Sequence, residues 1–221
     1  MRRRQPPAPA PVPFSPAAAR AHRAGLGLTP DQVAEGMAAH GVRLLPGHVL
    51  GWESGQIRPT EEEFVALARA LWCPPASLMG MPPATLRDHR VARELGQEQT
   101  ARRIGISLAA YRKAEATGVW NGDEDQTWAL AQALRLTLRE LVRVTGRTAE
   151  LEQLLKKAVD GRWQAQLSAI ARIVPAGPGR LEAALAALQS EYLVPTHWGA
   201  TAPPSPKVPP ATRFWELLEG R

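Results

Sequence analysis

Apolar residues recur every three or four positions through most of the chain, which is the spacing that places them on one face of an α-helix. No segment alternates apolar and polar residues between turn residues, as a half-buried β-strand would. Two segments lack the helical pattern, the basic arm 1–14 and the linker 194–211. Both are rich in proline, and the arm is expected to be disordered. The pattern therefore predicts an all-α protein.

An internal repeat divides the helical body. RAHRAGLGLTPDQVA, which starts at Arg20, aligns with RDHRVARELGQEQTA at an offset of 67 residues. Further along, ALARAL from Ala66 aligns with ALAQAL at an offset of 63, and Glu53 aligns with Glu115 at 62. Because the offset falls by about five residues, the first copy is expected to have a longer turn between its second and third helices.

The repeat and the apolar spacing together predict two domains of five helices each, over residues 15–82 and 84–146. In the first domain the expected helices are 16–25, 30–40, 46–54, 60–72 and 76–80. In the second domain they are 85–95, 97–104, 108–117, 124–135 and 137–145. Thr29, Thr60 and Ser107 stand where a side chain caps the start of a helix.

The C-terminal third is predicted to be a helical hairpin with a short helix after it. Two apolar stripes over 147–193 are separated by the helix-breaking run PAGPG. The hairpin is expected either to pack on the second domain or to form a homodimer. The final helix, 212–221, carries Phe214, Trp215, Leu217 and Leu218. It could dock on a partner protein or fold back on its own domain, and folding back is slightly favoured.

Composition narrows the class of partner. The net charge of +6 and the isoelectric point of about 10.2 favour a nucleic acid or an acidic protein. Cys73 is the only cysteine, which excludes an intrachain disulfide and a zinc site built from cysteines. No apolar run approaches the roughly 18 residues that a membrane span needs. We expect a cytoplasmic, nucleoid-associated protein that binds no membrane and uses no cofactor.

The repeated segment also has the spacing of two crossing helices. In the second copy, GQEQTARRIGISLAAYRKAEATG, a small Ala101 suits a helix crossing and Gly105 suits the tight turn after it. The first copy has GLTPDQVA and then WESG. Over residues 16–146 the chain resembles the helix-turn-helix proteins of the phage repressor and Cro family (XRE type), in two tandem copies. The resemblance implies sequence-specific binding of double-stranded DNA in transcriptional regulation.

In a helix-turn-helix, one helix rests over the phosphates and the next enters the major groove. In the second copy the outward residues of the reading helix are Leu108, Ala109, Arg112 and Lys113. Arg112 is the best candidate for a guanine edge, because a bidentate contact from arginine to guanine gives about 1–3 kcal/mol of discrimination. Lys113 is expected to contact phosphate.

Three further residues of the second copy are candidates for DNA contact: Gln97, Arg103 and Ser107. Gln97 stands at a helix start, and in the family that the chain resembles this position often orients another side chain. Among the arginines, Arg102 is expected to belong to a solvated face rather than to the DNA interface.

The first copy is poorly equipped to read bases. Its third helix offers His48 as the only polar side chain in PGHVLG, and residues 15–82 hold five arginines against six acidic residues. Its candidates for DNA contact are Arg43, His48, Gln56 and Arg58. We therefore expect the second copy, helped by the MRRR arm in a minor groove, to supply most of the affinity. The first copy would add a weaker contact.

Enzyme activity is not expected. The chain has no P-loop, no HExxH and no Gly-x-Ser-x-Gly, and its five histidines are scattered. The serious alternative to a DNA-binding regulator is a protein-interaction scaffold, in which helix-turn-helix domains have lost DNA reading and kept the fold.

Overall fold

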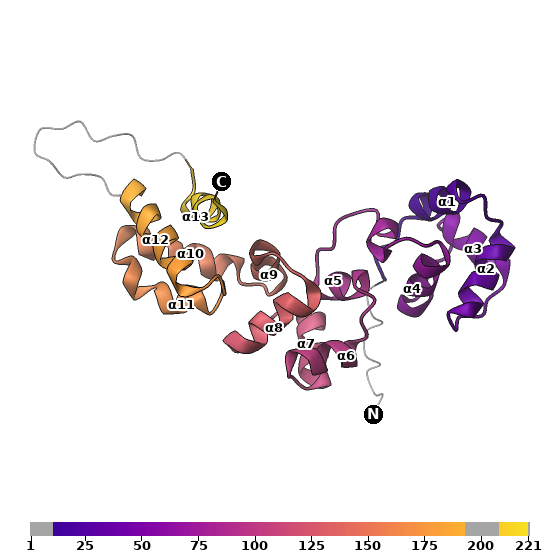
Figure 1. The fold of residues 1–221 in the computed structure, drawn as a ribbon, viewed down its shortest axis with the longest axis horizontal. Helices are drawn as coiled ribbons and strands as arrows, with labels where there is room; N and C mark the ends of the chain where they lie inside the picture. The colour runs from indigo at the N-terminus through magenta and orange to yellow at the C-terminus, as the bar shows by residue number, and fades with distance from the viewer. Residues whose placement is uncertain (1–10, 193–207, 221) are drawn as a thin grey trace, which may run out of the picture. The chain divides into compact units, whose positions relative to one another are not determined.

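The computed structural model describes residues 11–192 and 208–220. These residues form thirteen α-helices, two short 3₁₀ helices and no β-strand (Figure 1). The prediction of an all-α protein is therefore confirmed for the described part of the chain. None of the helices described is long and apolar enough to cross a bilayer. The chain divides into two compact units, each of which is described by itself.

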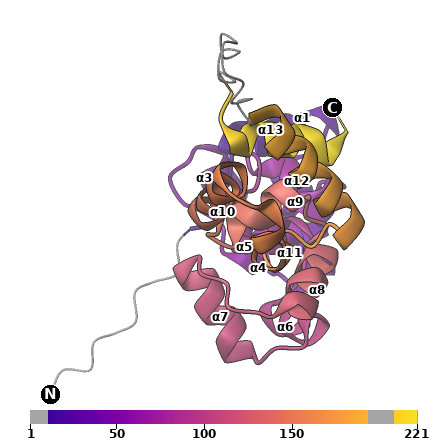
Figure 2. The same cartoon turned by 90° about the vertical axis from the view of Figure 1, so that its left-hand side faces the viewer.

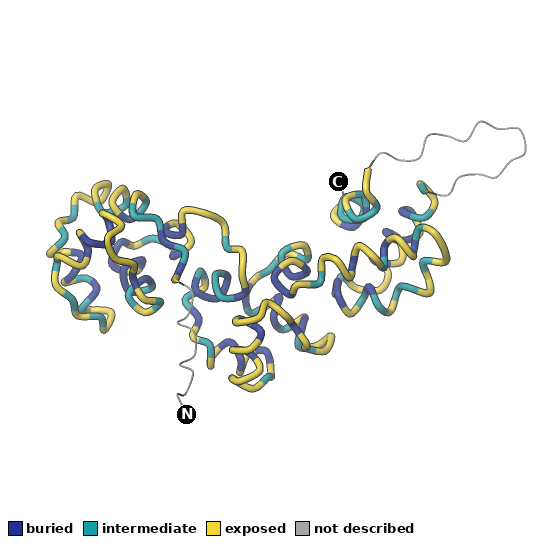
Figure 3. Tube along the Cα trace, turned by 180° about the vertical axis from the view of Figure 1, so that it is seen from behind, coloured by how far each residue is buried: buried dark blue, intermediate teal, exposed yellow. Residues whose placement is uncertain are grey.

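The first unit, Met1–Gly96, is built around one apolar core. Its helices are α1 (Pro16–Gly25), α2 (Pro30–Ala39), α3 (Pro46–Glu53), α4 (Glu61–Ala70), the 3₁₀ helix η1 (Pro75–Leu78) and α5 (Leu86–Ala92). Each begins within one residue of its predicted start. Trp52 and Phe64 are among the largest fully buried side chains. In Figure 3 the buried residues follow the inward sides of the helices and the loops are largely exposed.

Local hydrogen bonds explain where these helices begin. Thr29 and Thr60 each accept a hydrogen bond from the backbone N–H three residues later, and the side chains of Gln32 and Glu63 accept one from the backbone N–H of the cap. Backbone N–H groups in the first helical turn have no partner within the helix, so these bonds stabilise the start. The predicted caps at Thr29, Thr60 and Ser107 are confirmed.

The disorder predicted for residues 1–14 is wrong at the end of that segment. Val12 and Phe14 are only 2% and 8% exposed and belong to the first core. The ring of Phe14 meets that of Phe64 edge-on, with centroids 6.2 Å apart. The neighbouring prolines leave the segment less backbone entropy to lose on folding. Burial of two apolar side chains is therefore enough to anchor it. The MRRR arm lies in residues 1–10, outside the described residues.

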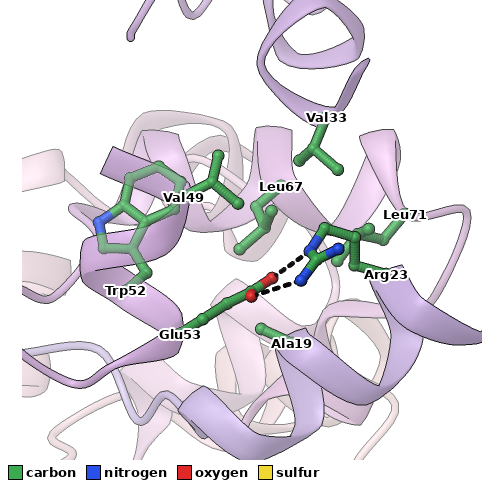
Figure 4. Close-up of a pocket in the computed structure, with 8 residues that line it drawn as sticks. All are labelled: Ala19, Arg23, Val33, Val49, Trp52, Glu53, Leu67 and Leu71. Atoms are coloured by element: carbon green, nitrogen blue, oxygen red, sulfur yellow. Dashed lines mark hydrogen bonds and ion pairs between the residues drawn. The ribbon is translucent and has the colours of Figure 1, made fainter. Parts of the chain in front are cut away.

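A buried ion pair joins α1 to α3 (Figure 4). Arg23 donates from Nε and Nη2 to the two carboxylate oxygens of Glu53, at 2.6 and 2.8 Å, and from Nη1 to the carbonyl of Leu28 at 2.8 Å. The apolar side chains around the pair are Ala19, Val33, Val49, Leu67 and Leu71. The hydrogen bond to Glu53 outweighs burial and raises the pKa of Arg23. The C-terminal end of α3 is thereby fixed against α1.

The division between the units falls after Gly96, not at residue 83 as predicted. Helix α5, expected to begin the second domain, contacts η1 and belongs to the first unit. Its Arg90 is fully buried and donates to both carboxylate oxygens of Glu61 at the start of α4. Val91 enters the first core. Charge pairing and apolar burial thus attach α5 to the helices that precede it.

Replacing Glu61 with glutamine is expected to flatten the acid dependence of the first unit's stability. Burial raises the pKa of the Glu61 carboxyl, but hydrogen bonds and charge from Arg90 and Arg87 more than offset this, so the pKa lies below the usual 4.5. Such a carboxyl stabilises the fold above about pH 4.5 and loses this effect as the pH falls through the lowered pKa. Thermal unfolding followed between about pH 7 and 3 should show a steeper acid loss in the wild type than in Glu61→Gln.

Glu62→Gln is the matched control. Glu62 is the next residue of the same helix, is exposed, and forms no ion pair within the described residues. Its variant should keep the acid dependence of the wild type. A Glu61→Gln profile parallel to that of the wild type would show that this ion pair does not contribute to acid sensitivity.

The second unit, Gln97–Arg221, begins with four helices, each of which starts within one residue of its predicted start. Its helices are α6 (Gln97–Ile104), α7 (Leu108–Thr117), α8 (Glu124–Leu134), α9 (Leu138–Val144), α10 (Thr148–Asp160), the 3₁₀ helix η2 (Trp163–Ala165), α11 (Leu167–Ala171), α12 (Pro178–Tyr192) and α13 (Pro210–Glu219). Within the first four, α6 contacts α7 and α8.

The hairpin predicted over 147–193 is correct in its second arm and wrong in its first. The second arm is the single helix α12. The first arm is divided into α10, η2 and α11, because α10 ends at Asp160 and Gly161 leaves the helical conformation at φ −135° and ψ −130°. A glycine inside a helix costs only about 1 kcal/mol, so Gly161 alone did not predict the end of a helix. The apolar stripe continues past it, and the sequence therefore predicted one unbroken arm. The core of this region includes Leu155, Ile170 and Leu185.

The C-terminal helix α13 folds back onto its own unit, as favoured from the sequence. It contacts α10 and α12 (Figures 1 and 2), and Phe214 and Leu218 are 0% and 4% exposed. Arg213 adds a two-pronged ion pair with Glu191 at 2.7 and 2.8 Å, which lowers the pKa of that carboxyl. The helix starts at Pro210 rather than at 212; most of the linker 194–211 lies outside the described residues.

This packing bears on two of the partners considered above. The apolar face of α13 is covered, so it is not available to a partner protein. Among the described residues after 146, Val208 is the only large hydrophobic residue that is exposed. The homodimer through the C-terminal helices stays a prediction.

The repeat also appears in the backbone. Glycine and non-glycine residues with positive φ recur at aligned positions in the two copies. The aligned pairs are Gly27 and Glu94, Gly41 and Gly105, Gly55 and Gly118, and Trp72 and Arg135. Arg90 repeats the contact of Arg23 as well, since its Nη1 donates to the carbonyl of Leu95 at 2.8 Å, five residues on. Aligned residues thus adopt matching local conformations.

Candidate nucleic-acid interface

Helix α6 has one buried face and one charged face. Thr100, Ala101 and Ile104 are buried, whereas Arg102 and Arg103 are exposed. Ala101 is 2% exposed, so its small side chain suits the close crossing with α7 that the sequence predicted. The charged face is consequently directed to solvent.

The turn between α6 and α7 is closed by backbone hydrogen bonds. Gly105 adopts φ +79°, and the N–H groups of Gly105 and Ile106 both donate to the carbonyl of Ala101, at 3.0 and 3.1 Å. A Cβ added at Gly105 would meet nothing within 4 Å. Glycine is therefore needed here for its left-handed backbone and not for space.

Helix α7 begins at a capped end and presents a basic outer face. Ser107 accepts a hydrogen bond from the N–H of Ala110 at 3.2 Å. Tyr111 and Ala114 are buried on the inner side. The predicted contact residues Ala109, Arg112 and Lys113 are exposed, and Leu108 is half-buried.

A chain of hydrogen bonds holds Arg112 in place. The Nε of Arg112 donates to Oε1 of Gln97 at 3.1 Å, and the Nε2 of Gln97 donates to Oε2 of Glu115 at 2.7 Å. Both ends of the Gln97 amide are therefore engaged. Gln97 thereby positions the Arg112 side chain, and its Nε2 keeps a second N–H beside the one that Glu115 accepts. The sequence did not single out Glu115 as the residue that fixes Gln97.

The far end of the Arg112 side chain remains available. Within the described residues, neither of its Nη groups forms a hydrogen bond or ion pair. Arg103 and Lys113 likewise form no ion pair there. The outer face of α6 and α7 therefore carries cationic groups that intrachain carboxylates do not neutralise. Such a face can attract a polyanion.

The candidates in the first copy lie before, within and after α3. Arg43, His48, Gln56 and Arg58 are all exposed. The Nδ1 of His48 lies 3.3 Å from the carbonyl of Leu45, at the start of the helix. No lysine or arginine lies on α3 itself, whose one acidic residue is the buried Glu53. The structure therefore does not gather these four residues into one basic face on the helix.

Neither a family model, nor a curated protein, nor a solved structure matches this chain. The functional assignment therefore rests on the residues themselves. Among the described residues, no group of three or more histidine, cysteine or acidic side chains is placed to hold a metal ion. Burial raises the pKa of the Cys73 thiol, which leaves it mostly protonated at neutral pH.

Proposed function

We propose that this chain is a sequence-specific DNA-binding regulator of transcription, in which α7 enters the major groove and α6 rests over the phosphates. The observation that carries the proposal is the fixed position of Arg112. Gln97, itself held by Glu115, binds its Nε, and the two Nη groups form no hydrogen bond within the described residues. A guanidinium presented in this way can donate to the O6 and N7 atoms of guanine.

The surrounding charges suit the phosphates that flank such a contact. Arg103 on α6 and Lys113 on α7 are exposed and form no ion pair within the described residues. The first N–H groups of α7 add a partial positive charge at a helix start, where phosphate binds favourably. Affinity that comes from these groups should fall steeply with salt, as condensed counterions are released from DNA.

The tandem arrangement belongs to the same proposal. The aligned positive-φ residues and the aligned capping boxes of Thr60 and Asp123 support two copies of one repressor-like fold. In sequence the second copy runs from α5 to α9, and its helices α6–α9 in the second unit would supply most of the affinity. The binding site on DNA should then be asymmetric, because the two copies differ at their outer faces.

Arg112→Ala is expected to abolish the preference for one base pair. Loss of a bidentate arginine contact costs about 1–3 kcal/mol, or roughly 5- to 150-fold in discrimination at that position. The measurement is selection of bound duplexes from a random DNA pool by the wild type and by the variant. The wild type should enrich a defined sequence, and the variant should tolerate all four bases at one position.

Lys113→Ala is the matched control, since it removes an exposed cation from the same helix. It should weaken binding to all sequences alike and reduce the salt dependence, without changing the preferred sequence. Failure of the wild type to enrich any sequence would overturn the proposal. An Arg112→Ala profile identical to that of the wild type would overturn the role of Arg112.

A further inference from the structure

The outer face of α7 carries an exposed alanine between its two cations. Successive residues of an α-helix turn by about 100°, so Ala109 points within about 60° of Arg112 and about 40° of Lys113. It points about 140–160° away from the buried residues Tyr111 and Ala114. Ala109 itself is exposed. A methyl group therefore stands in the middle of the basic face, on the side of the helix opposite to the core.

The position of Ala109 relative to Arg112 is fixed. Both residues belong to α7, and the Nε of Arg112 is held by Gln97 at 3.1 Å, which is held in turn by Glu115 at 2.7 Å. The helix rises by about 4.5 Å from Ala109 to Arg112, compared with about 3.4 Å between successive base pairs. A group that contacts Ala109 should therefore lie within about two base pairs of the guanine that Arg112 contacts.

The chemistry of an alanine side chain limits what it can recognise on a base. It has no donor or acceptor, so it cannot distinguish the hydrogen-bonding groups of base edges. The apolar group that a base presents in the major groove is the C5-methyl group of thymine. Cytosine has only a hydrogen at this carbon unless it is methylated. Contact with an alanine then removes water without burying a methyl group.

The neighbouring residues of α7 are less suited to this contact. Leu108 is half-buried and points within about 60° of the buried Tyr111. Ala110 is exposed, but it points about 160° away from Arg112. The ammonium group of Lys113 is strongly hydrated and suits a phosphate better than a methyl group. Ala109 is therefore the residue of this face that matches an apolar group beside the guanine.

We infer that Ala109 recognises the C5-methyl group of a pyrimidine within about two base pairs of the guanine that Arg112 reads. The ligand is then duplex DNA in which this pyrimidine is thymine or 5-methylcytosine. The inference rests on the proposed function and adds a consequence to it. At a site that has cytosine in this position, methylation of the cytosine raises the affinity of the protein for DNA.

The test uses the full chain and a duplex that the wild type selects from the random DNA pool. The guanine is the position at which Arg112→Ala loses its preference, and a thymine is expected within about two base pairs of it. Four duplexes then differ only in that pyrimidine and its complementary base: thymine, uracil, cytosine and 5-methylcytosine. Removal of the methyl group, from thymine or from 5-methylcytosine, should weaken wild-type binding by about fourfold, the factor that corresponds to burial of one methyl-sized group.

Two glycine variants assign the effect to one side chain. Ala109→Gly should bind the thymine and uracil duplexes equally, because it lacks the group that contacts the methyl. Ala110→Gly is the matched control, since it makes the same substitution at the next residue of the same helical turn. It should keep the fourfold difference, and the melting temperatures of the two variants should fall by similar amounts.

The outcomes separate this inference from the proposed function. The inference is overturned, and the proposed function kept, if the selected site has an Arg112-dependent guanine without a thymine near it. The same holds if the wild type binds the thymine and uracil duplexes alike, if Ala109→Gly keeps the difference, or if Ala110→Gly also loses it. Enrichment of no sequence by the wild type would overturn the proposed function and this inference together.

Discussion

Arg23→Met should destabilise the first unit by about 3–5 kcal/mol, since it leaves a buried carboxylate without its partner. The side chain of Glu53 is 2% exposed, and Arg23 satisfies both of its oxygens. The same variant loses the bond from Arg23 to the carbonyl of Leu28. Because Glu53 ends α3, this helix should be the first to loosen.

Amide hydrogen exchange, read by mass spectrometry for separate segments, can measure this effect in the full chain. Exchange in α1 and α3 should accelerate by about two to four orders of magnitude, at 1.36 kcal/mol for each tenfold change. Segments α10–α13 should exchange as in the wild type.

Arg20→Met is the matched control on the same helix. Arg20 lies 3.8 Å from Glu53, but its side chain is 63% exposed, so its removal should cost less than about 1 kcal/mol. Replacing Arg23 and Glu53 together with methionine should recover most of the lost stability, because no buried charge is then left unpaired. Equal effects of Arg20→Met and Arg23→Met would contradict the role given to the buried pair.

Phe214→Ala is expected to release α13 from the second unit. Phe214 is fully buried against α10 and α12, and truncating a buried phenylalanine costs about 3–5 kcal/mol through lost contacts and the cavity left behind. The remaining contacts of α13 are the buried side chain of Leu218, partly buried apolar residues, and the ion pairs of Arg213 with Glu191 and of Arg139 with Glu219. Exposed pairs contribute about 0–1 kcal/mol each and should not retain the helix.

The observable is exchange of the α13 amides together with proteolysis of the full chain. In Phe214→Ala the α13 amides should exchange nearly as fast as an unfolded peptide, and cleavage near the C-terminus should increase. Leu217→Ala is the comparison variant, because Leu217 is only half-buried and its loss should have a smaller effect. If the α13 amides of Phe214→Ala exchanged as slowly as those of the wild type, another contact would have to hold the helix.

Helix starts were predictable because their causes are local. Thr29, Thr60 and Ser107 cap helices through residues three positions away, so the sequence alone shows the hydrogen bond. Burial of the N-terminal segment was not predictable in the same way. Val12 and Phe14 stand among prolines, and only their packing in the core that contains Phe64, some fifty residues later, reveals why they are ordered. Long-range contacts of this kind leave no periodic pattern.

The candidate site shows the same limit. The sequence identified Gln97 and Arg112 separately, from their positions in a helix-turn-helix pattern. Their hydrogen bond, and the role of Glu115 in fixing Gln97, depends on how α6 and α7 cross. For the third helix of the first copy, the sequence showed only the lack of polar residues in PGHVLG, and the structure adds that Leu50 is exposed.

The attachment of α5 has a practical consequence. By alignment, α5 opens the second repeat, but its Arg90 neutralises Glu61 and its Val91 fills the first core. A truncation at residue 83 would remove Arg90 and Val91 from the first unit. The fragment that then carries them would lack Glu61 of α4, the partner of Arg90. The boundary of the sequence repeat and the boundary of the folded unit differ in this chain. The ends of expression fragments should therefore be chosen so that α5 stays with the first unit.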